Sequence, residues 1–135
     1  MRELTIPAIP ESIPVVTGFI DGQLKALDCA MKARKQIDVA IDELFCNISR
    51  YAYGAATGEA TVRFDFDEAT RTASIAFVDS GVPFDPLEKA DPDVTLPAER
   101  RGIGGLGIFM VKKTMDRLEY SRENGYNVLT IHKRI

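Results

Sequence analysis

Apolar residues recur at helical spacing in two segments of the N-terminal third of the chain. Between residues 12 and 28 they fall three or four positions apart, and Ser12 followed by Pro14 is typical of a helix start. A longer stripe runs through residues 32–53, and Gly54 stands where a helix of that length would end. The pattern therefore predicts two consecutive helices, the second with a continuous core-facing side. That side consists of Ile37, Ile41, Leu44, Phe45, Ile48 and Ala52.

Elsewhere apolar and polar residues alternate one by one, as they do in strands with one buried face. A short segment at residues 3–8 is β-like, and strict alternation over 61–66 predicts a second strand. A third alternating run covers residues 72–79, in which Asp79 falls on the same side as Phe77. A charged residue at the end of a core-facing row is unusual, because carboxylates are rarely buried without a partner.

The C-terminal third begins with an irregular segment and ends with a hairpin. Residues 80–105 combine scattered prolines and acidic residues with no period, so we expect a functional lid or a disordered segment. Apolar residues between 108 and 115 then predict a buried helix. The last two strands are expected at 117–123 and 126–135, because an Asn-Gly pair between them is a strong signal for a type I′ turn.

The order of these elements predicts a fold class. It runs strand, helix, helix, strand, strand, irregular segment, helix, strand, strand. Consecutive strands joined by tight turns pair antiparallel, and the helices between them have one face of the sheet to cover. We therefore expect an α+β two-layer sandwich, with a mainly antiparallel sheet and its helices on one face.

Size and charge narrow the function classes. The chain has 135 residues and a mass of 14.9 kDa, which fits a single domain over residues 1–135. A net charge of −3 argues against binding of nucleic acid through the overall charge of the molecule. The N-terminus lacks a signal-peptide pattern, and no segment approaches the roughly 20 apolar residues of a membrane span, so we expect a cytoplasmic protein. A chain of this size has no room for a separate substrate domain, so its substrate is expected to be another molecule.

Cysteine and histidine are too few for two common kinds of site. Cys29 and Cys46 together with His132, the only histidine, do not make a zinc cluster, and both thiols are expected to be free and buried. A single histidine, expected to point outward from the last strand, also gives no basis for a Ser-His-Asp triad.

Two polar residues on the second predicted helix are candidates for chemistry. Glu43 and Asn47 are four positions apart and so share a face, at the margin of the apolar stripe. A carboxylate and an amide arranged in this way suit activation of a hydroxyl and oxygen coordination of a hard cation. Taken alone, a Glu-x-x-x-Asn pattern is more often an ordinary solvated helix face.

A third candidate follows the strand at 72–79. Asp79 suits acceptance of a hydrogen bond from an exocyclic amine, and Gly81 allows a flat ligand to approach the backbone closely. The alternative, without a ligand, is an Asp-Ser-Gly turn that ends the strand.

A glycine-rich run precedes the third predicted helix. Residues 102–107 read Gly-Ile-Gly-Gly-Leu-Gly, and such a turn presents free N–H groups and the positive end of a helix dipole to phosphate. The run is not a Walker A loop, and no βαβ context supports a dinucleotide-binding motif. Arg100 and Arg101 stand just before it and are placed to reach a terminal phosphate. A flexible hinge with solvated charge is the alternative.

The order of these motifs resembles the GHKL (Bergerat-fold) ATPases, and most closely the bacterial anti-sigma factor serine/threonine kinases. The resemblance covers nearly the whole chain. Its most specific pieces are Asp-Glu-Leu-Phe-Cys-Asn-Ile at 42–48, Asp-Ser-Gly-Val-Pro-Phe-Asp-Pro at 79–86 and Gly-Gly-Leu-Gly-Ile at 104–108. It implies the Bergerat fold, with an ATP lid at about residues 82–104.

The resemblance also implies a role for each candidate residue. Glu43 would be the catalytic base for a serine or threonine hydroxyl, Asn47 would bind the Mg²⁺ that bridges the ATP phosphates, and Asp79 with Gly81 would bind adenine. Related chains often carry a basic residue where Ile103 stands, so Arg100 or Arg101 would take that phosphate contact. The phosphate-binding residues implied by the resemblance are Arg101, Gly104, Gly105, Leu106 and Gly107.

The function implied is that of an ATP-binding anti-sigma factor and protein serine/threonine kinase. Its implied partners are a sigma factor and a STAS-type anti-sigma factor antagonist, which the kinase phosphorylates, with a PP2C-type phosphatase in the pathway, and the chain would form a homodimer. An ATP-gated protein-binding switch with little kinase activity is the alternative, although a pure binder needs no base at position 43. A sensor histidine kinase is disfavoured, because His132 lies in a predicted strand rather than a phosphoacceptor helix.

Overall fold

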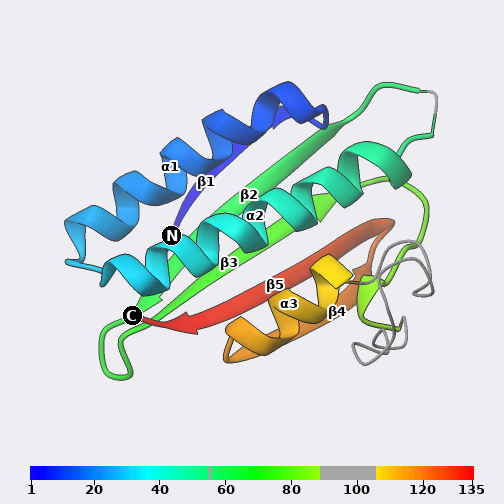
Figure 1. Cartoon of the computed structure of the whole chain (residues 1–135). Helices are drawn as coiled ribbons and strands as arrows, with labels where there is room; N and C mark the ends of the chain where they lie inside the picture. Colours follow the sequence, from blue (N-terminus) through cyan, green and yellow to red (C-terminus); the bar gives the residue numbers. More distant parts are fainter. Residues whose placement is uncertain (55, 89–105) are drawn as a thin grey trace.

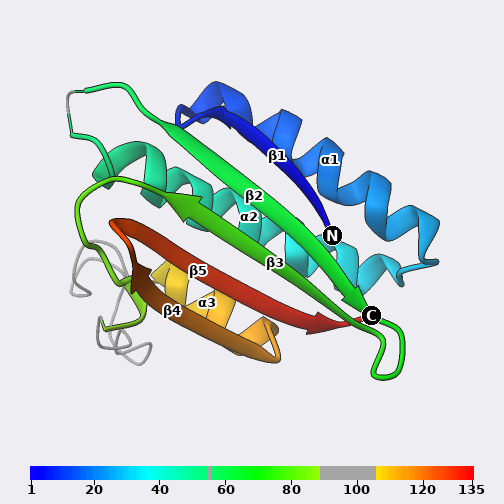
Figure 2. The ribbon, with the colours of Figure 1, turned by 180° about the vertical axis from the view of Figure 1, so that it is seen from behind.

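The computed structural model describes residues 1–54, 56–88 and 106–135. Its centre is a five-stranded sheet in the order β1-β2-β3-β5-β4, and every neighbouring pair is antiparallel. The helices of the described chain lie against one face of this sheet, and the view from behind shows the strands in front (Figures 1 and 2). The predicted α+β sandwich is therefore confirmed. The strands are β1 (Arg2–Pro7), β2 (Glu59–Asp67), β3 (Thr72–Asp79), β4 (Arg117–Glu123) and β5 (Tyr126–Arg134), and the helices are α1 (Ile13–Ala26), α2 (Met31–Tyr51) and α3 (Leu106–Thr114).

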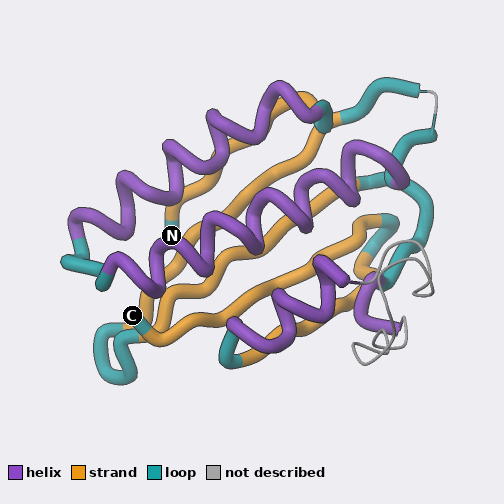
Figure 3. Tube along the Cα trace, in the orientation of Figure 1, coloured by secondary structure: helices purple, strands orange, loops and turns teal. Residues whose placement is uncertain are grey.

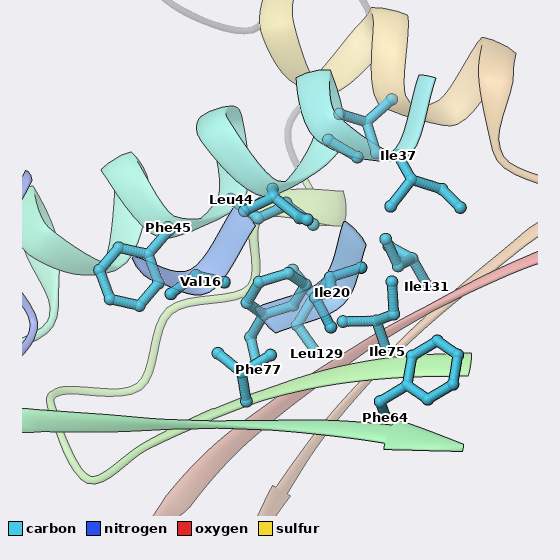
Figure 4. Close-up of a cluster of buried hydrophobic side chains, with 14 of the residues drawn as sticks. Val16, Ile20, Ile37, Leu44, Phe45, Phe64, Ile75, Phe77, Leu129 and Ile131 are labelled. Atoms are coloured by element: carbon cyan, nitrogen blue, oxygen red, sulfur yellow. The ribbon is translucent and has the colours of Figure 1, made fainter. Parts of the chain in front are cut away.

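The core fills the space between the helices and the sheet. In Figure 4, Leu44 of α2 points toward Phe77 of β3. Phe45 of α2 and Leu129 of β5 belong to the same buried cluster. Phe45 and Phe77 are almost fully buried, with exposed fractions of 0% and 1%. Burying one such side chain stabilises the fold by about 1.5–3 kcal/mol, so this contact layer holds α2 firmly over the centre of the sheet.

Most predicted boundaries agree with the structure within two residues, and the helices and strands follow one another in the predicted order (Figure 3). The β4–β5 turn is also confirmed, because Asn124 and Gly125 have φ of 51° and 85°, the two positive angles of a type I′ turn. Gly54 has φ of +60° and follows the end of α2.

Ser12 is the N-cap residue of α1 and Pro14 lies in its first turn, as the helix-start pattern predicted; a 3₁₀ turn (Pro10–Ser12) precedes the helix, and Ser12 makes no capping hydrogen bond. One smaller expectation was wrong. Cys29 and Cys46 are free, as expected, but they are only half-buried. Burial still raises the pKa of the Cys29 thiol.

The strand order carries the functional consequence of the fold. β5 enters the sheet between β3 and β4, so the end of β3 pairs with the beginning of β5. The end of α2 and the segment after β3 meet at the same edge, away from the C-terminus (Figure 1). Within the described residues, no helix has both the length and the hydropathy of a membrane span.

Candidate functional site

A pocket opens at this edge, between the last turns of α2 and the paired ends of β3 and β5. The space enclosed by its walls is small, about 20 Å³. Most of its wall is aliphatic or aromatic, with a few polar groups converging on it, which is the usual make-up of a small-molecule site. The pocket is lined by Leu44, Asn47, Ile48, Ala52, Phe77, Asp79, Phe84, Pro86, Tyr120, Asn127 and Leu129.

Asp79 lies at the bottom of this pocket as the last residue of β3. Its side chain is buried, with only 5% exposed, as the sequence pattern predicted for the end of a core-facing row. Oδ1 accepts hydrogen bonds from the backbone N–H of Gly81 at 2.9 Å and from Nδ2 of Asn127 at 2.9 Å. Among the described residues, both hydrogen bonds of the carboxylate go to Oδ1, so Oδ2 is available to a donor in the pocket.

Position 81 requires a glycine for a packing reason that the sequence did not reveal. A Cβ at this position would lie 2.1 Å from the backbone oxygen of Ala52 at the end of α2, so no other residue fits. The same oxygen accepts a hydrogen bond from Val82 N at 2.8 Å. Tyr53 makes a second contact between the end of α2 and the segment after β3, because its hydroxyl accepts a hydrogen bond from the backbone N–H of Ser80 at 3.0 Å. The close approach is therefore to the helix end, and it fixes the path of the chain beside the pocket.

Glu43 and Asn47 both lie on the side of α2 that faces this edge. Asn47 lines the pocket, and both side chains are half-buried. The Glu43 carboxylate packs directly on α3: a Cβ at Gly107 would lie 2.2 Å from its Cδ and its Oε2. Gly107 is the second residue of α3, so the carboxylate sits at the positive end of that helix dipole.

The glycine-rich run is described only at its end. Leu106 begins α3 and Gly107 follows it, whereas the predicted phosphate-binding residues Arg101, Gly104 and Gly105 lie outside the described residues, as does Arg100. Of the predicted lid at 82–104, the structure describes residues 82–88.

The described part of the predicted lid packs against the pocket. The ring of Phe84 lies 5.2 Å from that of Tyr51, measured between centroids, at an interplanar angle of 33°. Pro86 is buried and lines the pocket. The chain therefore leaves β3 by covering the end of α2 before it reaches the segment that is not described.

Three polar residues of the site were missed by the sequence analysis. Asn127 is buried, with 4% exposed, and contacts Asp79, while Tyr120 donates a hydrogen bond to Asn127 Oδ1. Arg122 donates to the carbonyl of Gly81 at 2.7 Å. All three lie on the last hairpin, where they look like ordinary strand residues. The β3–β5 register pairs Asn127 with Asp79, and the β4–β5 register pairs it with Arg122, so the strand pairing reveals them.

Metal-binding groups in the described part of the chain are sparse. No cluster of three or more His, Cys, Asp or Glu side chains suited to a metal occurs there. Mg²⁺ in nucleotide sites takes one or two protein oxygen ligands and completes its shell with phosphate and water. The amide oxygen of Asn47 in the pocket wall is compatible with that pattern.

The sequence relatives of this chain agree with one another. The sequence profile described as the histidine kinase-like ATPase domain matches residues 6–133. A serine-protein kinase RsbW of Bacillus cereus is 29% identical over 131 residues, covering 94% of this chain and 81% of that protein. A serine-protein kinase RsbW of Bacillus anthracis is 28% identical with the same coverage.

Solved structures show the same fold. The RsbU and RsbW domains of a Mycobacterium tuberculosis protein align with a TM-score of 0.67 and 14% identity, over 99% of this chain and 32% of that one. A histidine kinase domain of a blue-light activated histidine kinase from Erythrobacter litoralis aligns with a TM-score of 0.55 and 14% identity, over 90% of this chain and 60% of that one. This chain therefore spans about a third of the first structure, and at such identities the likeness concerns the fold.

The profile match extends over nearly all of the chain, and the fold is consistent with it. An ATPase-like domain of this kind uses ATP. The chain belongs to the histidine kinase-like ATPase domain family.

Proposed function

We propose that this chain is an ATP-binding anti-sigma factor and protein serine/threonine kinase, which phosphorylates an anti-sigma factor antagonist and sequesters a sigma factor. The observation that carries the proposal is the placement of Glu43 against Gly107, one helical turn from Asn47 and at the same edge as the buried Asp79. The names of the relatives support the kinase activity. The proposed setting is a cytoplasmic homodimer, with a STAS-type antagonist as substrate and a PP2C-type phosphatase in the same pathway.

The adenine end of the site is the pocket itself. Oδ2 of Asp79 accepts the exocyclic amine of adenine, because Oδ1 is already used by Gly81 and Asn127. The aliphatic walls, Ile48 and Leu129 among them, pack on the faces of the flat base. Gly81 contributes by holding the chain close to α2, which leaves the pocket open beside it.

The phosphate end is assigned to the start of α3. We assign binding of the phosphates to the backbone N–H groups of Gly104, Gly105, Leu106 and Gly107, since the N-terminus of a helix offers free donors and a positive dipole end. Arg101 neutralises charge on the terminal phosphate. Asn47 would hold Mg²⁺ through its amide oxygen, and the metal would supply positive charge that neutralises the phosphates.

Glu43 acts as the general base. Its carboxylate accepts the proton of the incoming serine or threonine hydroxyl as the hydroxyl oxygen forms a bond to the γ-phosphorus. The bond from that phosphorus to the bridging oxygen breaks, and ADP leaves with the electron pair. Packing against Gly107 keeps the carboxylate beside the helix end that binds the phosphates, which supplies the positioning that phosphoryl transfer chiefly needs.

The test uses purified protein, γ-labelled Mg-ATP and a STAS-type antagonist. Glu43→Gln keeps the size of the side chain but removes the base, so we expect transfer of label to fall by about 100-fold or more while ATP affinity stays near that of the wild type. Glu68→Gln, in the exposed β2–β3 turn at the other end of the sheet, is the matched control and should transfer normally. Unchanged labelling in Glu43→Gln would contradict the assignment of the base. ATP binding without labelling by the wild type would favour the ATP-gated switch instead.

A further inference from the structure

Asn127 is unusual among the described residues because its amide is almost fully buried. It is 4% exposed, and Ser12 and Asp79 are the other polar residues in the buried set of the described chain. Burying an amide costs free energy unless its donors and acceptors are satisfied. Its hydrogen bonds therefore reveal what the side chain does.

Every hydrogen-bonding capacity of the Asn127 amide is used. Nδ2 donates to Asp79 Oδ1 at 2.9 Å and to the carbonyl of Val82 at 2.8 Å. Oδ1 accepts from the backbone N–H of Phe84 at 3.3 Å and from the hydroxyl of Tyr120. An amide has two N–H donors and two acceptor lone pairs, so none remains for a ligand.

The partners also fix the orientation of the amide. A flipped side chain would place its oxygen against the Asp79 carboxylate and the Val82 carbonyl, and its NH₂ against the Phe84 N–H. Both arrangements set like groups against each other. The Tyr120 hydroxyl donates to the acceptor side and reinforces the same orientation.

We propose that Asn127, oriented by Tyr120, is a positioning residue that aims Asp79 Oδ2 at the amine of adenine and ties residues 82–84 to the same carboxylate. This inference rests on the proposed function, because it assumes that the pocket takes the adenine base. Asn127 lines the pocket but has no hydrogen bond left for the nucleotide, since its amide is saturated. It acts through Asp79 on one side and through the start of the chain segment that leaves β3 on the other.

The geometry makes Asp79 selective. With Oδ1 occupied by two N–H donors, Oδ2 is left as an acceptor facing the pocket, and it favours a base that carries an amine. A hypoxanthine base presents a carbonyl oxygen at that position, which the carboxylate repels. ITP carries hypoxanthine in place of adenine. The ratio of the affinities for ATP and ITP therefore measures how well Oδ2 of Asp79 is positioned for the amine.

The test is Asn127→Asp, which keeps the shape of the side chain but replaces its donor by an oxygen that faces Asp79. The titratable side chains hydrogen-bonded to Asn127 are Asp79 and Tyr120. At pH 8 we expect ATP affinity to fall about 10–100-fold, the worth of a hydrogen bond to a charged group, and the preference for ATP over ITP to shrink. At pH 5.5 a proton shared between the two carboxyls restores a donor, so the loss should be partly reversed.

Two further variants keep the result interpretable. Asn124→Asp makes the same chemical change in the exposed β4–β5 turn and should match the wild type in affinity, in ATP preference and in pH profile. Tyr120→Phe removes only the hydroxyl donor to Asn127, and we expect it to weaken ATP binding about 3–10-fold without a pH effect. This second variant adds no charge, so it tests the network even if Asn127→Asp does not fold at pH 8.

The outcomes separate the inference from the proposed function. If the wild type binds ATP while both Asn127→Asp and Tyr120→Phe bind it equally well, the positioning role is wrong and the proposed function stands. Equal losses for ATP and ITP, with no dependence on pH, would show a merely structural role and also overturn the inference. If the wild type itself binds neither nucleotide, the proposed function fails.

Discussion

Asp79 and Asn127 illustrate at the scale of single residues how a buried carboxylate is made useful. Burial of an ionised group is costly unless donors compensate it, and here one oxygen takes two donors while the other is left for the pocket. Asp79 was recognisable in the sequence because a charge at the end of an apolar strand face stands out. Asn127 was not, since an asparagine after a hairpin turn is ordinary and its partner is distant in the sequence.

A second carboxylate pair, Asp21 on α1 and Asp38 on α2, lies away from the site. Burial, then a hydrogen bond to Asp21 and the charge of Asp21, raise the pKa of Asp38 from 3.8 to about 6, and Arg34 opposes the shift. A raised carboxyl pKa means that the folded state binds more protons than the unfolded state between about pH 4 and pH 6. The stability this proton contributes is present below pH 4 and is lost as the pH rises through 6.

We therefore predict that Asp38→Asn stabilises the fold at pH 8 by about 1 kcal/mol, after allowance for solvent screening, and has little effect at pH 4. Urea unfolding followed at both pH values measures the difference. Asp65→Asn, an exposed substitution on β2, provides the matched control. A stabilisation that is the same at pH 4 and pH 8 would contradict the claim that the pKa of Asp38 is raised in the folded state.

At the scale of elements, the contact between α2 and α3 assembles the proposed catalytic end. Glu43 comes from the middle of one helix and Gly107 from the first turn of the other, and there is no space between them for a Cβ. The spacing of Glu43 and Asn47 predicted a shared helix face correctly. What that face contacts depends on how α3 packs, which no local pattern in the sequence encodes.

Gly107→Ala should separate stability from activity. Alanine is favoured over glycine in a helix by about 1 kcal/mol, and the clash is with the far end of a flexible side chain, so we expect the variant to fold at least as well as the wild type. Because the methyl group displaces the Glu43 carboxylate, phosphotransfer should fall by about tenfold or more. Gly22→Ala, on α1 with open space around it, should stabilise similarly and leave phosphotransfer intact. Wild-type transfer by Gly107→Ala would show that this contact does not position the base.

At the scale of the whole molecule, the element order and fold class followed from local signals, whereas the strand order did not. Alternation along β2 and β3 and the turn residues Asn124 and Gly125 marked strands and a hairpin. Nothing in those patterns says that the hairpin docks with β5 against β3, a choice made by long-range packing of Leu129 and Ile131 in the core. This docking places Asn127 beside Asp79 and so completes the pocket.

The central claim is that Mg-ATP binds in the pocket through Asp79, and its most direct test is the free energy of unfolding measured with and without Mg-ATP. At a hundredfold excess over Kd, a ligand that binds only the folded state stabilises it by about 2.7 kcal/mol. We expect this gain for the wild type and for the exposed control Asp65→Asn, and little or none for Asp79→Asn, whose amide would set a donor against the adenine amine. An equal gain in Asp79→Asn, or no gain in the wild type, would contradict the account.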